Sequence, residues 1–372
     1  MKIIRLSFKD RRSGWNIKNL YFNNLTLLVG ASGVGKTQIL NAINSLVRIG
    51  KGKSAGVVEW TLDFEVNNLK YRWEGAFVSD ENDQNKTFDI QEPALPIEYE
   101  RLYRINEREE LLIDRIIQKL VFKGEQTVKL EATKSAIALL KEEPDIMPVY
   151  SGLTHVYSLR PSVESGIRIP FTKIEGVAPI KNLDELRKYT NFTPIEKLFL
   201  LYKNQISEYR DIVDRFTDIF SFVETIDFTI ETFIDKFQYP VLRIKERGLN
   251  TWIPQDRISS GMLRTLVHII VISLAEDGDV ILIDEFENGL GVNCIEEVAD
   301  MIINPEQNLQ FVLTSHHPYV INNIDYKWWK IVTRKGSDVS VHTAESLRIG
   351  DHSKHDAFLQ LVQSSAYQTG TL

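Results

Sequence analysis

The stretch that decides the fold is LLVGASGVGKTQIL, residues 27–40, where an apolar run breaks into glycines and continues as a helix-like pattern. It fits the spacing G-x-x-x-x-G-K-[ST], with Gly30 first and Gly35, Lys36 and Thr37 last. The apolar residues before the loop predict a buried strand, and TQILNAINSLV after it has apolar residues at helical spacing. This order of strand, glycine loop and helix predicts an α/β fold built around a phosphate-binding loop.

The loop has the residue types that a phosphate cradle requires. Glycines allow backbone N–H groups to turn inward, and the following helix presents the partial positive charge of its N-terminus. Lys36 is expected to reach the β- and γ-phosphates, and the Thr37 hydroxyl is expected to bind Mg²⁺. A chance glycine turn is the alternative, with an expected frequency of roughly 1% in a chain of this length. The predicted nucleotide-binding residues are Gly30, Ala31, Ser32, Gly33, Val34, Gly35, Lys36, Thr37 and Gln38.

The bulk composition is that of a soluble globular protein. The chain has 372 residues, 43% hydrophobic and 26% charged, which allows one long domain or two. It has no run of eighteen apolar residues and no secretory apolar region, so we expect no membrane span. The single cysteine, Cys294, excludes an intramolecular disulfide and a cysteine-built metal site. Together these features predict a cytoplasmic protein.

The formal net charge of −7 argues against nucleic-acid binding as the main task, because such proteins usually carry a basic surface. Basic clusters occur at residues 9–12, at Lys51 and Lys53, and between Arg243 and Arg247. Each is open to two interpretations, a solvated face or a DNA contact. DNA therefore remains a possible partner.

A second motif, VILIDEFE at residues 280–287, predicts a buried strand whose carboxyl end carries Asp284 and Glu285. Ligands of open α/β sheets bind at that edge. An aspartate there can support Mg²⁺, and a neighbouring glutamate can polarise an attacking water. The alternative is an ordinary acidic strand end on the surface.

Two further motifs flank the acidic strand in sequence. In RISSGMLRTLVHIIVISLA, residues 257–275, Ser259, Ser260 and Gly261 precede an apolar helix, where they either bind an anion or simply cap the helix. In FVLTSHHPYVI, residues 311–321, a strand runs out into His316. That histidine is either a satisfied polar group or a neighbour of the carboxylates, and the order of the motifs favours the second interpretation.

The four motifs, in this order, resemble those of ABC-type ATPases of the SMC, RecF and OLD kind. More narrowly, the chain resembles stand-alone ATPases of prokaryotic antiphage defence systems such as Septu and PARIS. The resemblance implies an α/β fold: an ABC/SMC-like P-loop NTPase head with a mixed central sheet, an antiparallel β subdomain and an inserted helical lobe. It also implies ATP and Mg²⁺ as cofactors.

The same resemblance implies roles for the motif residues. Glu285 would be the general base, His316 the switch histidine, and Asp284 a support for the metal together with Thr37. Ser259, Ser260 and Gly261 would form a signature that contacts the γ-phosphate of the opposite subunit, and residues 288–291 would cross the dimer interface. Transporters have glycine where this chain has Ser260 and glutamine where it has Met262. The metal-sensing glutamine is not assigned.

We therefore expect an ATPase that acts as a sensor or scaffold in antiviral defence. Nucleotide would close a homo-oligomer of at least two subunits, and closure would control a companion effector, a nuclease in the leading version. The alternative is a RecF-type DNA-repair ATPase that binds DNA directly. A transporter motor would need a coupling surface for membrane subunits and a standard signature. The residues after the His316 strand are too few for a nuclease domain of the OLD kind.

The remaining segments predict a mixture of hairpins and helices. Strands are expected at residues 1–8 and 20–29, hairpins at 56–78 and 95–116, and strand-like backbone at 239–254. Residues 79–86 are expected to form a polar loop, residues 127–160 to be mostly helical with a break at Pro144, and residues 193–223 to form the longest helix, opened by Thr193 and Pro194.

These patterns suggest four parts. The expected division is an N-terminal ATPase lobe at 1–100, an inserted, mostly helical lobe at 101–250, a C-terminal ATPase lobe at 251–345 and a tail at 346–372. No heptad pattern persists in the insertion, so a compact lobe is expected rather than a coiled-coil arm. The tail gathers Asp351, His352, His355 and Asp356, which suggest either a metal site or a helix cap followed by a polar turn.

Overall fold

The computed structural model describes residues 1–78, 95–160, 170–232, 237–350 and 353–371. The chain forms two compact units, the first made of residues 1–158, 277–284 and 308–372 and the second of residues 159–276 and 285–307. The boundaries of these units differ from those of the four-part division, which stays a prediction. The expected loop at 79–86 lies outside the described residues. Within the described residues, no helix combines the length and the apolar character that crossing a bilayer requires.

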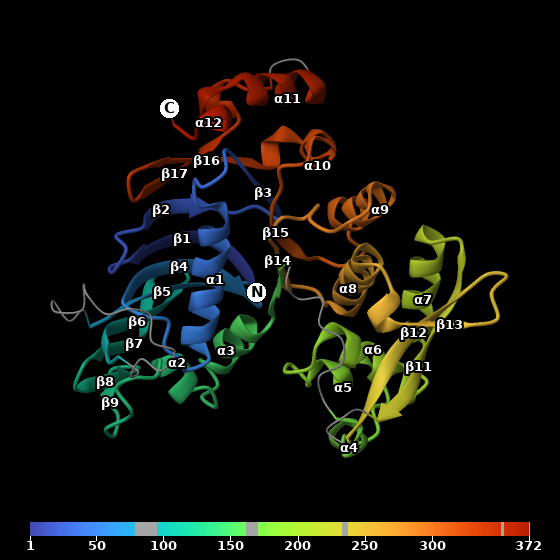
Figure 1. Ribbon diagram of the computed structural model, residues 1–372. Coiled ribbons are helices and arrows are strands. Elements are labelled where there is room, and N and C mark those ends of the chain that lie inside the picture. The colour runs from blue at the N-terminus through green and yellow to red at the C-terminus, as the bar shows by residue number, and fades with distance from the viewer. Residues whose placement is uncertain (79–94, 161–169, 233–236, 351–352, 372) are drawn as a thin grey trace. The chain divides into compact units, whose positions relative to one another are not determined.

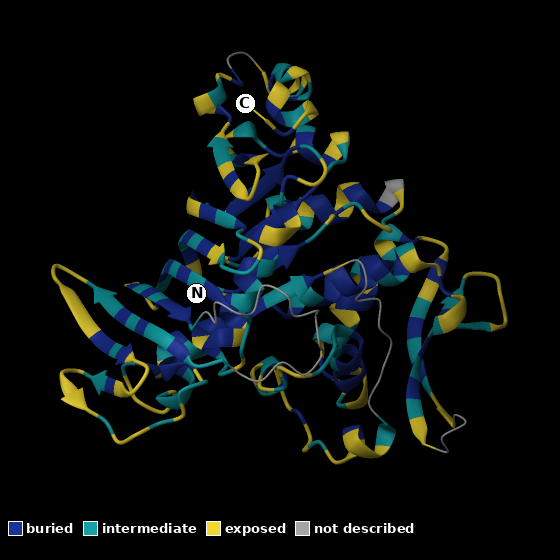
Figure 2. Cartoon of the chain, turned by 60° about the vertical axis from the view of Figure 1, so that its left-hand side comes forward, coloured by how far each residue is buried: buried dark blue, intermediate teal, exposed yellow. Residues whose placement is uncertain are grey.

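The first unit is built on one large mixed sheet (Figure 1). Its strand order is β10-β14-β15-β3-β16-β17-β2-β1-β4-β5-β6-β7-β8-β9. The strands that carry the predicted motifs are parallel neighbours next to the edge strand β10: β14 (Val280–Ile283), β15 (Gln310–Thr314) and β3 (Leu25–Val29). A fourth strand, β16 (Trp329–Lys335), is parallel to β3 on its other side. Every residue of β14, β15 and β3 is buried, as the dark blue centre of Figure 2 shows. Mostly apolar strands that are buried along their whole length are typical of strands covered on both faces.

The antiparallel part of the sheet confirms the two predicted hairpins. In the first, Asn67 and Asn68 have φ values of +50° and +62°, the backbone that a tight two-residue hairpin turn needs. The sequence analysis did not separate β2 from β3 and missed the short strands β8 and β9. Strand β17 (Asp338–Thr343) joins this part to β16 and is parallel to its neighbour β2. The antiparallel strands are β2 (Asn16–Tyr21), β1 (Lys2–Asp10), β4 (Val58–Val66), β5 (Leu69–Phe77), β6 (Ile97–Ile105), β7 (Glu109–Ile116), β8 (Lys119–Phe122) and β9 (Glu125–Gln126).

Residues 127–160 are less helical than predicted, which corrects that expectation. Only the short helices α2 (Ala136–Leu139) and α3 (Met147–Thr154) form, with the predicted break at Pro144 between them, and the segment ends as the edge strand β10 (Val156–Leu159). Before α2 the backbone is held by the buried Arg115, whose guanidinium donates to the carbonyls of Glu131 and Lys134. These carbonyls therefore have partners without a helix.

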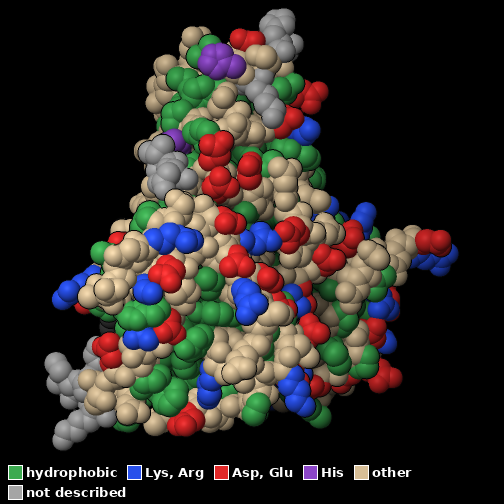
Figure 3. Space-filling model, turned by 90° about the vertical axis from the view of Figure 1, so that its right-hand side faces the viewer, with side chains coloured by type: hydrophobic (Ala, Val, Ile, Leu, Met, Phe, Trp, Pro, Cys, Tyr) green, Lys and Arg blue, Asp and Glu red, His purple; other side chains and the backbone are tan. Residues whose placement is uncertain are grey.

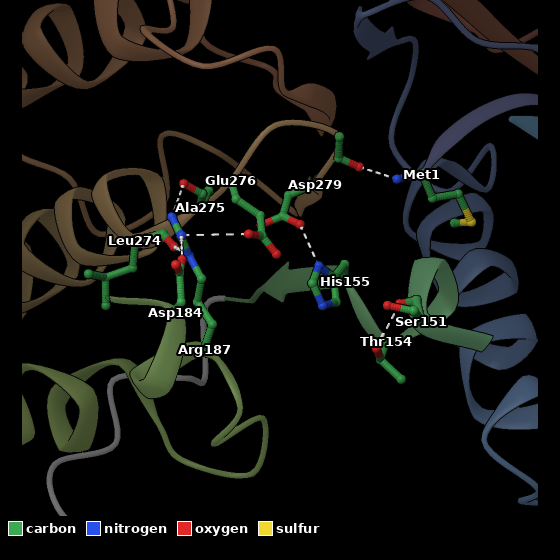
Figure 4. A network of polar contacts seen from close by, with 11 residues as sticks. Met1, Ser151, Thr154, His155, Asp184, Arg187, Leu274, Ala275, Glu276 and Asp279 are labelled. Carbon is green, nitrogen blue, oxygen red and sulfur yellow. Dashed lines mark hydrogen bonds and ion pairs between the residues drawn. The ribbon is translucent and has the colours of Figure 1, made fainter. Parts of the chain in front are cut away.

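A polar contact fixes β10 near the start of β14. The ring of His155 lies 3.1 Å, Nδ1 to Oδ1, from the carboxylate of Asp279, which is 1% exposed (Figure 4). The backbone N–H of Val280 also donates to the carbonyl of His155. The side-chain contact and the backbone hydrogen bond together place β10 at the edge of the sheet, beside β14.

The second unit combines helices with a three-stranded antiparallel sheet, in the order β11 (Val223–Thr232), β12 (Gln238–Glu246) and β13 (Trp252–Pro254). The strand-like pattern at 239–254 is confirmed, whereas β11 was missed. The predicted single helix at 193–223 is wrong. It divides into α6 (Pro194–Lys203), which begins with the expected Thr193 cap, and α7 (Glu208–Ile219). Gln205 between them has φ +55°, a left-handed backbone that ends a helix.

Helix α8 (Ser260–Leu274) is anchored at its C-terminal end by Arg187, which lies in α5 (Leu183–Arg187). Its Nε donates to the carbonyl of Leu274 at 3.2 Å, and Nη2 donates to that of Ala275 at 3.1 Å (Figure 4). These carbonyls have no partner within the helix, and a cation is favourable there. The other helices of this unit are α4 (Phe171–Glu175), η2 (Gln255–Arg257) and α9 (Val292–Ile303).

The C-terminal part of the first unit adds helices after β15. They are α10 (Pro318–Asn323), η3 (Tyr326–Trp328), η4 (Glu345–Leu347), α11 (Lys354–Gln363) and α12 (Ser365–Gln368). Ser353 caps α11, because its hydroxyl accepts from the backbone N–H of Asp356 at 3.1 Å and donates to that carboxylate at 2.6 Å. The capping interpretation of the tail is thus confirmed at Ser353, while Asp351 and His352 lie outside the described residues.

Candidate functional site

The phosphate loop runs from buried strand β3 into helix α1 (Lys36–Gly50), as the sequence predicts. Its glycines are required by close packing and by backbone conformation. Gly30 has φ +146°, and a Cβ there would lie 2.5 Å from the carbonyl oxygen of Val332. Gly35 has φ +106°, and a Cβ there would lie 3.1 Å from Nε1 of Trp15. Side chains at these positions would displace the loop.

Lys36 lies inside the loop rather than on the surface. Its side chain is 6% exposed, and Nζ donates to the carbonyls of Gly30 and Ala31, both at 2.8 Å. The N-cap of α1 is Gly35, and among the described residues no side chain caps the helix. The ammonium group and the first-turn N–H groups therefore gather positive charge at one helix end, where an anion is favoured.

Asp284 is where the phosphate loop and the acidic strand meet. The register pairs Ile283 with Leu313 and Leu313 with Leu27, so the carboxyl ends of β14, β15 and β3 reach the same edge of the sheet. There, the Thr37 hydroxyl donates to Oδ1 of Asp284 at 3.0 Å. The Thr314 hydroxyl donates to the same oxygen at 2.8 Å. The structure thus brings together two residues, Thr37 and Asp284, that lie far apart in the sequence.

Thr314 is a site residue that the sequence analysis did not single out. It is 1% exposed, lies at the end of β15 and orients the half-buried Asp284. The pattern that could have identified it is a hydroxyl residue at the end of a buried strand. The sequence analysis assigned a role only to His316 in this stretch. His316 itself is half-buried two residues further on, and its role as a switch stays a prediction.

A pocket of about 850 Å³ opens beside α1 in the first unit. This volume is within the range of about 300–1,000 Å³ that is typical of small-molecule sites. Residues spaced at 38, 41, 45 and 48 place one face of α1 along it. The charged and amide side chains that line it include Asp10, Arg12, Gln38, Arg48, Lys53 and Arg334. Gln38, a predicted binding residue, is the lining residue of α1 that lies nearest in sequence to the phosphate loop. More basic than acidic side chains line the pocket.

The C-terminal segment supports the outside of the phosphate loop. Gly370 is buried with φ +73°, and a Cβ there would lie 2.4 Å from Cγ1 of Val34 and 3.4 Å from Cβ of Ala31. Its carbonyl accepts from the backbone N–H of Arg334 at 2.8 Å. The Arg334 guanidinium in turn donates to the carbonyl of Gly33 at 3.3 Å. Gly370 and Arg334 therefore both contact the phosphate loop.

Glu285 occupies an unusual backbone conformation in the second unit. It has φ +47°, in the left-handed region, and its side chain is exposed. Its carboxylate accepts from the Asn288 side-chain amide at 2.6 Å. Its carbonyl accepts from the backbone N–H of Asn288 at 2.8 Å and from Nη2 of Arg264 at 3.0 Å. Left-handed non-glycine residues concentrate at functional sites, where the surroundings hold them.

The signature residues begin helix α8. The Ser259 hydroxyl accepts from the backbone N–H of Met262 at 3.2 Å, so the capping interpretation is confirmed for that residue. Ser259 and Ser260 are exposed. Gly261 packs tightly, since a Cβ there would lie 2.8 Å from the carbonyl oxygen of Gly289. Contact with an anion, and with another subunit, stays a prediction.

This fold and loop define a P-loop nucleotide-binding protein: a buried parallel strand, a glycine loop, a helix with a buried lysine, and an aspartate on a neighbouring parallel strand. Residues 25–322 match the family described as "AAA domain, putative AbiEii toxin, Type IV TA system". The match spans more than half of the chain, so the chain belongs to this AAA family of P-loop ATPases. No curated protein matches the sequence.

Solved structures of SMC head domains are similar to this chain at low identity. A head bound to the C-terminal winged-helix domain of ScpA has a TM-score of 0.49 and 15% identity over 92% of this chain and 98% of its own. A Pyrococcus furiosus head with an extended coiled coil, bound to the C-terminal domain of ScpA, has 0.46 and 14%, covering 93% and 98%. The Thermotoga maritima head has 0.42 and 14%, covering 92% and 99%.

Proposed function

We propose that this chain binds ATP with Mg²⁺ and hydrolyses it to ADP and phosphate. The observation that carries the proposal is the position of Asp284, whose carboxylate accepts from the hydroxyl of Thr37 directly after the phosphate loop. A hydroxyl and a carboxylate are the two oxygen ligands that P-loop proteins offer to magnesium. Family membership supports the proposal, because P-loop ATPases of this class use the same pair of motifs.

Each side chain has a defined task in this proposal. The loop N–H groups and Lys36 bind the phosphates, and the ammonium group exchanges its carbonyl partners for phosphate oxygens. Thr37 and Asp284 hold Mg²⁺, which supplies charge neutralisation at the β- and γ-phosphates when bound. Glu285 accepts a proton from the attacking water, and Thr314 keeps Asp284 in place. His316 senses the γ-phosphate from the end of β15.

We further propose that each ATP-binding site is completed by the signature residues of a second subunit. Ser259 and Ser260 are exposed at the start of α8, so their hydroxyl groups are accessible to such a partner. Gly261, packed against the carbonyl of Gly289, brings the helix start close to the segment that would cross the interface. The active unit is then at least a dimer.

In the cell, we propose that the ATPase is a cytoplasmic sensor or scaffold that controls a companion effector in antiviral defence. The family description, which names a toxin and a type IV toxin–antitoxin system, supports a two-component system of this kind. The alternative, direct DNA binding of the RecF type, is less favoured by the charge of −7. On the face shown in Figure 3, Lys and Arg side chains are interspersed with Asp and Glu rather than gathered into a stripe.

The test is the magnesium dependence of nucleotide binding and turnover. Asp284→Asn keeps the size of the side chain and removes its charge, so it should bind ATP in EDTA as the wild type does. Added Mg²⁺ should then tighten binding and start hydrolysis only in the wild type. Asp114→Asn on β7, an aspartate that pairs with Arg101 instead, is the matched control and should behave as wild type. Wild-type turnover by Asp284→Asn would overturn the proposal.

A binding assay with 30-base-pair duplex DNA at two salt concentrations tests the alternative. Salt-sensitive binding that depends on ATP would favour the RecF-type function. Absence of binding, with nucleotide-dependent association of the product of an adjacent gene, would favour the effector model.

A further inference from the structure

Arg264 is a buried cation in the second unit that no role assigned so far uses. It lies one turn into helix α8 and is 4% exposed. Its Nη2 donates to the backbone carbonyl of Glu285 at 3.0 Å. A buried arginine is costly unless its charge is compensated, so its contact with the residue proposed as the general base requires an explanation.

The backbone of Glu285 needs support. L residues rarely adopt the left-handed conformation, because Cβ then lies too close to the following carbonyl oxygen. Two donors hold the Glu285 carbonyl in place, the N–H of Asn288 at 2.8 Å and the Arg264 guanidinium at 3.0 Å. The Asn288 amide belongs to the same tight turn, whereas Arg264 comes from a different element. Arg264 therefore connects the Glu285 carbonyl to helix α8.

The contact belongs to a packed block rather than to a single hydrogen bond. Nδ1 of His268, one turn after Arg264, lies 2.8 Å from the Arg264 carbonyl, and because a carbonyl only accepts, Nδ1 carries the proton. The His268 ring is 1% exposed and meets Phe286 edge-on, with centroids 5.9 Å apart. Near the helix start, Gly261 abuts the carbonyl of Gly289. Three residues of α8, Gly261, Arg264 and His268, thus contact the turn after the acidic strand.

We propose that Arg264 is a positioning residue that orients the Glu285 carboxylate through the main chain. The direction of the Glu285 side chain depends on the backbone at that residue, and the Arg264 hydrogen bond holds the following peptide, which fixes its ψ angle. Because Arg264 is carried by the signature helix, a displacement of that helix turns the carboxylate. The inference rests on the proposed function, in which Glu285 is the general base, and it adds the residue that couples the base to the signature.

Two substitutions and a matched control separate positioning from general stability. Arg264→Met keeps an unbranched apolar stem and removes the donors, while Arg264→Lys keeps a cation. We expect Arg264→Met to lower kcat about 10²-fold, the scale of a misplaced catalytic group, with the Kd for ATP unchanged within about twofold. Arg264→Lys should recover part of kcat. Arg187→Met removes the arginine at the other end of α8 and should lower the melting temperature while leaving kcat within about twofold.

A double-variant cycle then tests whether Arg264 acts through Glu285. Once Glu285→Gln has removed the base, its orientation no longer matters, so adding Arg264→Met should cost little further rate. If the double variant instead loses the product of the two single-variant losses in kcat, the inference is wrong while the proposed function stands. Wild-type turnover by Glu285→Gln would overturn both. If Arg264→Met does not fold, Arg264→Lys enters the same cycle, and additive losses there contradict the inference equally.

Discussion

Helices α1 and α8 have the same length, fifteen residues, and each begins where the sequence predicts contact with a phosphate, yet their starts differ. The N-cap of α1 is Gly35, in a left-handed conformation, and no described side chain caps it. The N-cap of α8 is Ser259, in an extended conformation, and its own hydroxyl accepts from the N–H of Met262. The first helix leaves its N–H groups to a ligand, whereas the second satisfies one of them internally.

The two helices also differ in what surrounds them. One face of α1 is buried in the apolar core, and the other lines the pocket from Gln38 to Arg48. Helix α8 is buried over most of its length and carries three buried polar residues, Arg264, Thr265 and His268. In the proposed function, α1 would bind the nucleotide with backbone groups, while α8 would present the side chains of its exposed start to a second subunit.

The largest expected effect is at the start of α1. Lys36→Ala should reduce ATP binding below detection, because the loop has no second lysine or arginine to face the phosphates. Titration with a fluorescent ATP analogue measures this. Lys119→Ala on strand β8 provides an exposed control lysine and should bind as the wild type does. Unchanged affinity of Lys36→Ala would contradict the assignment of the loop.

Glu285→Gln is expected to separate binding from hydrolysis. Loss of a general base costs roughly 10²–10⁴ in rate, while the phosphate loop stays intact. The variant should therefore bind ATP, turn it over very slowly and accumulate as a closed dimer that light scattering or mass photometry detects. Near-wild-type turnover would show that another group activates the water.

An intermediate effect is expected from mixing Lys36→Ala with Ser259→Arg. In a mixed dimer one composite site carries both changes and the other carries neither, so part of the activity should return if one intact site suffices. Ser259→Ala is the control for the lost helix cap, which by itself costs about 1 kcal/mol of stability. If confirmed mixed dimers stay inactive while Glu285→Gln remains monomeric with ATP, the site does not lie between subunits.

The smallest expected effect is the pH dependence contributed by the buried histidine of α8. Burial, followed by the charge of Arg264, lowers the pKa of His268 to about 4, below the unfolded value of 6.5. The folded state therefore resists protonation, and this contribution to stability is lost as the pH falls from about 6.5 towards 4. Between pH 7 and pH 5 the wild type should lose on the order of 1–2 kcal/mol more unfolding free energy than His268→Gln. Equal losses in urea titrations would contradict the lowered pKa.

The sequence identified the residues of local motifs because their chemistry depends on neighbours in the chain. Gly30 to Thr37 form a loop whose glycines and lysine are a few residues apart, and β3, β14 and β15 are recognisable as short, mostly apolar runs. The hairpin at 56–78 and the Thr193 cap were predicted for the same reason. Where helix and strand patterns are short, prediction failed, as at residues 127–135, which a buried arginine holds, and at Gln205, where a left-handed residue divides one helix into two.

By itself, then, the sequence determined the class of the protein, the phosphate loop and the candidate acids. Only the tertiary structure decided which of these residues meet. The Asp284 carboxylate receives hydroxyl groups from Thr37 and Thr314 because three parallel strands end in register, and register is a property of pairing between distant segments. Arg264 contacts the Glu285 carbonyl because Gly261 lets α8 approach the next turn closely. A side chain that acts on a backbone atom of a remote residue leaves no local pattern, since its partner is a carbonyl that every residue has.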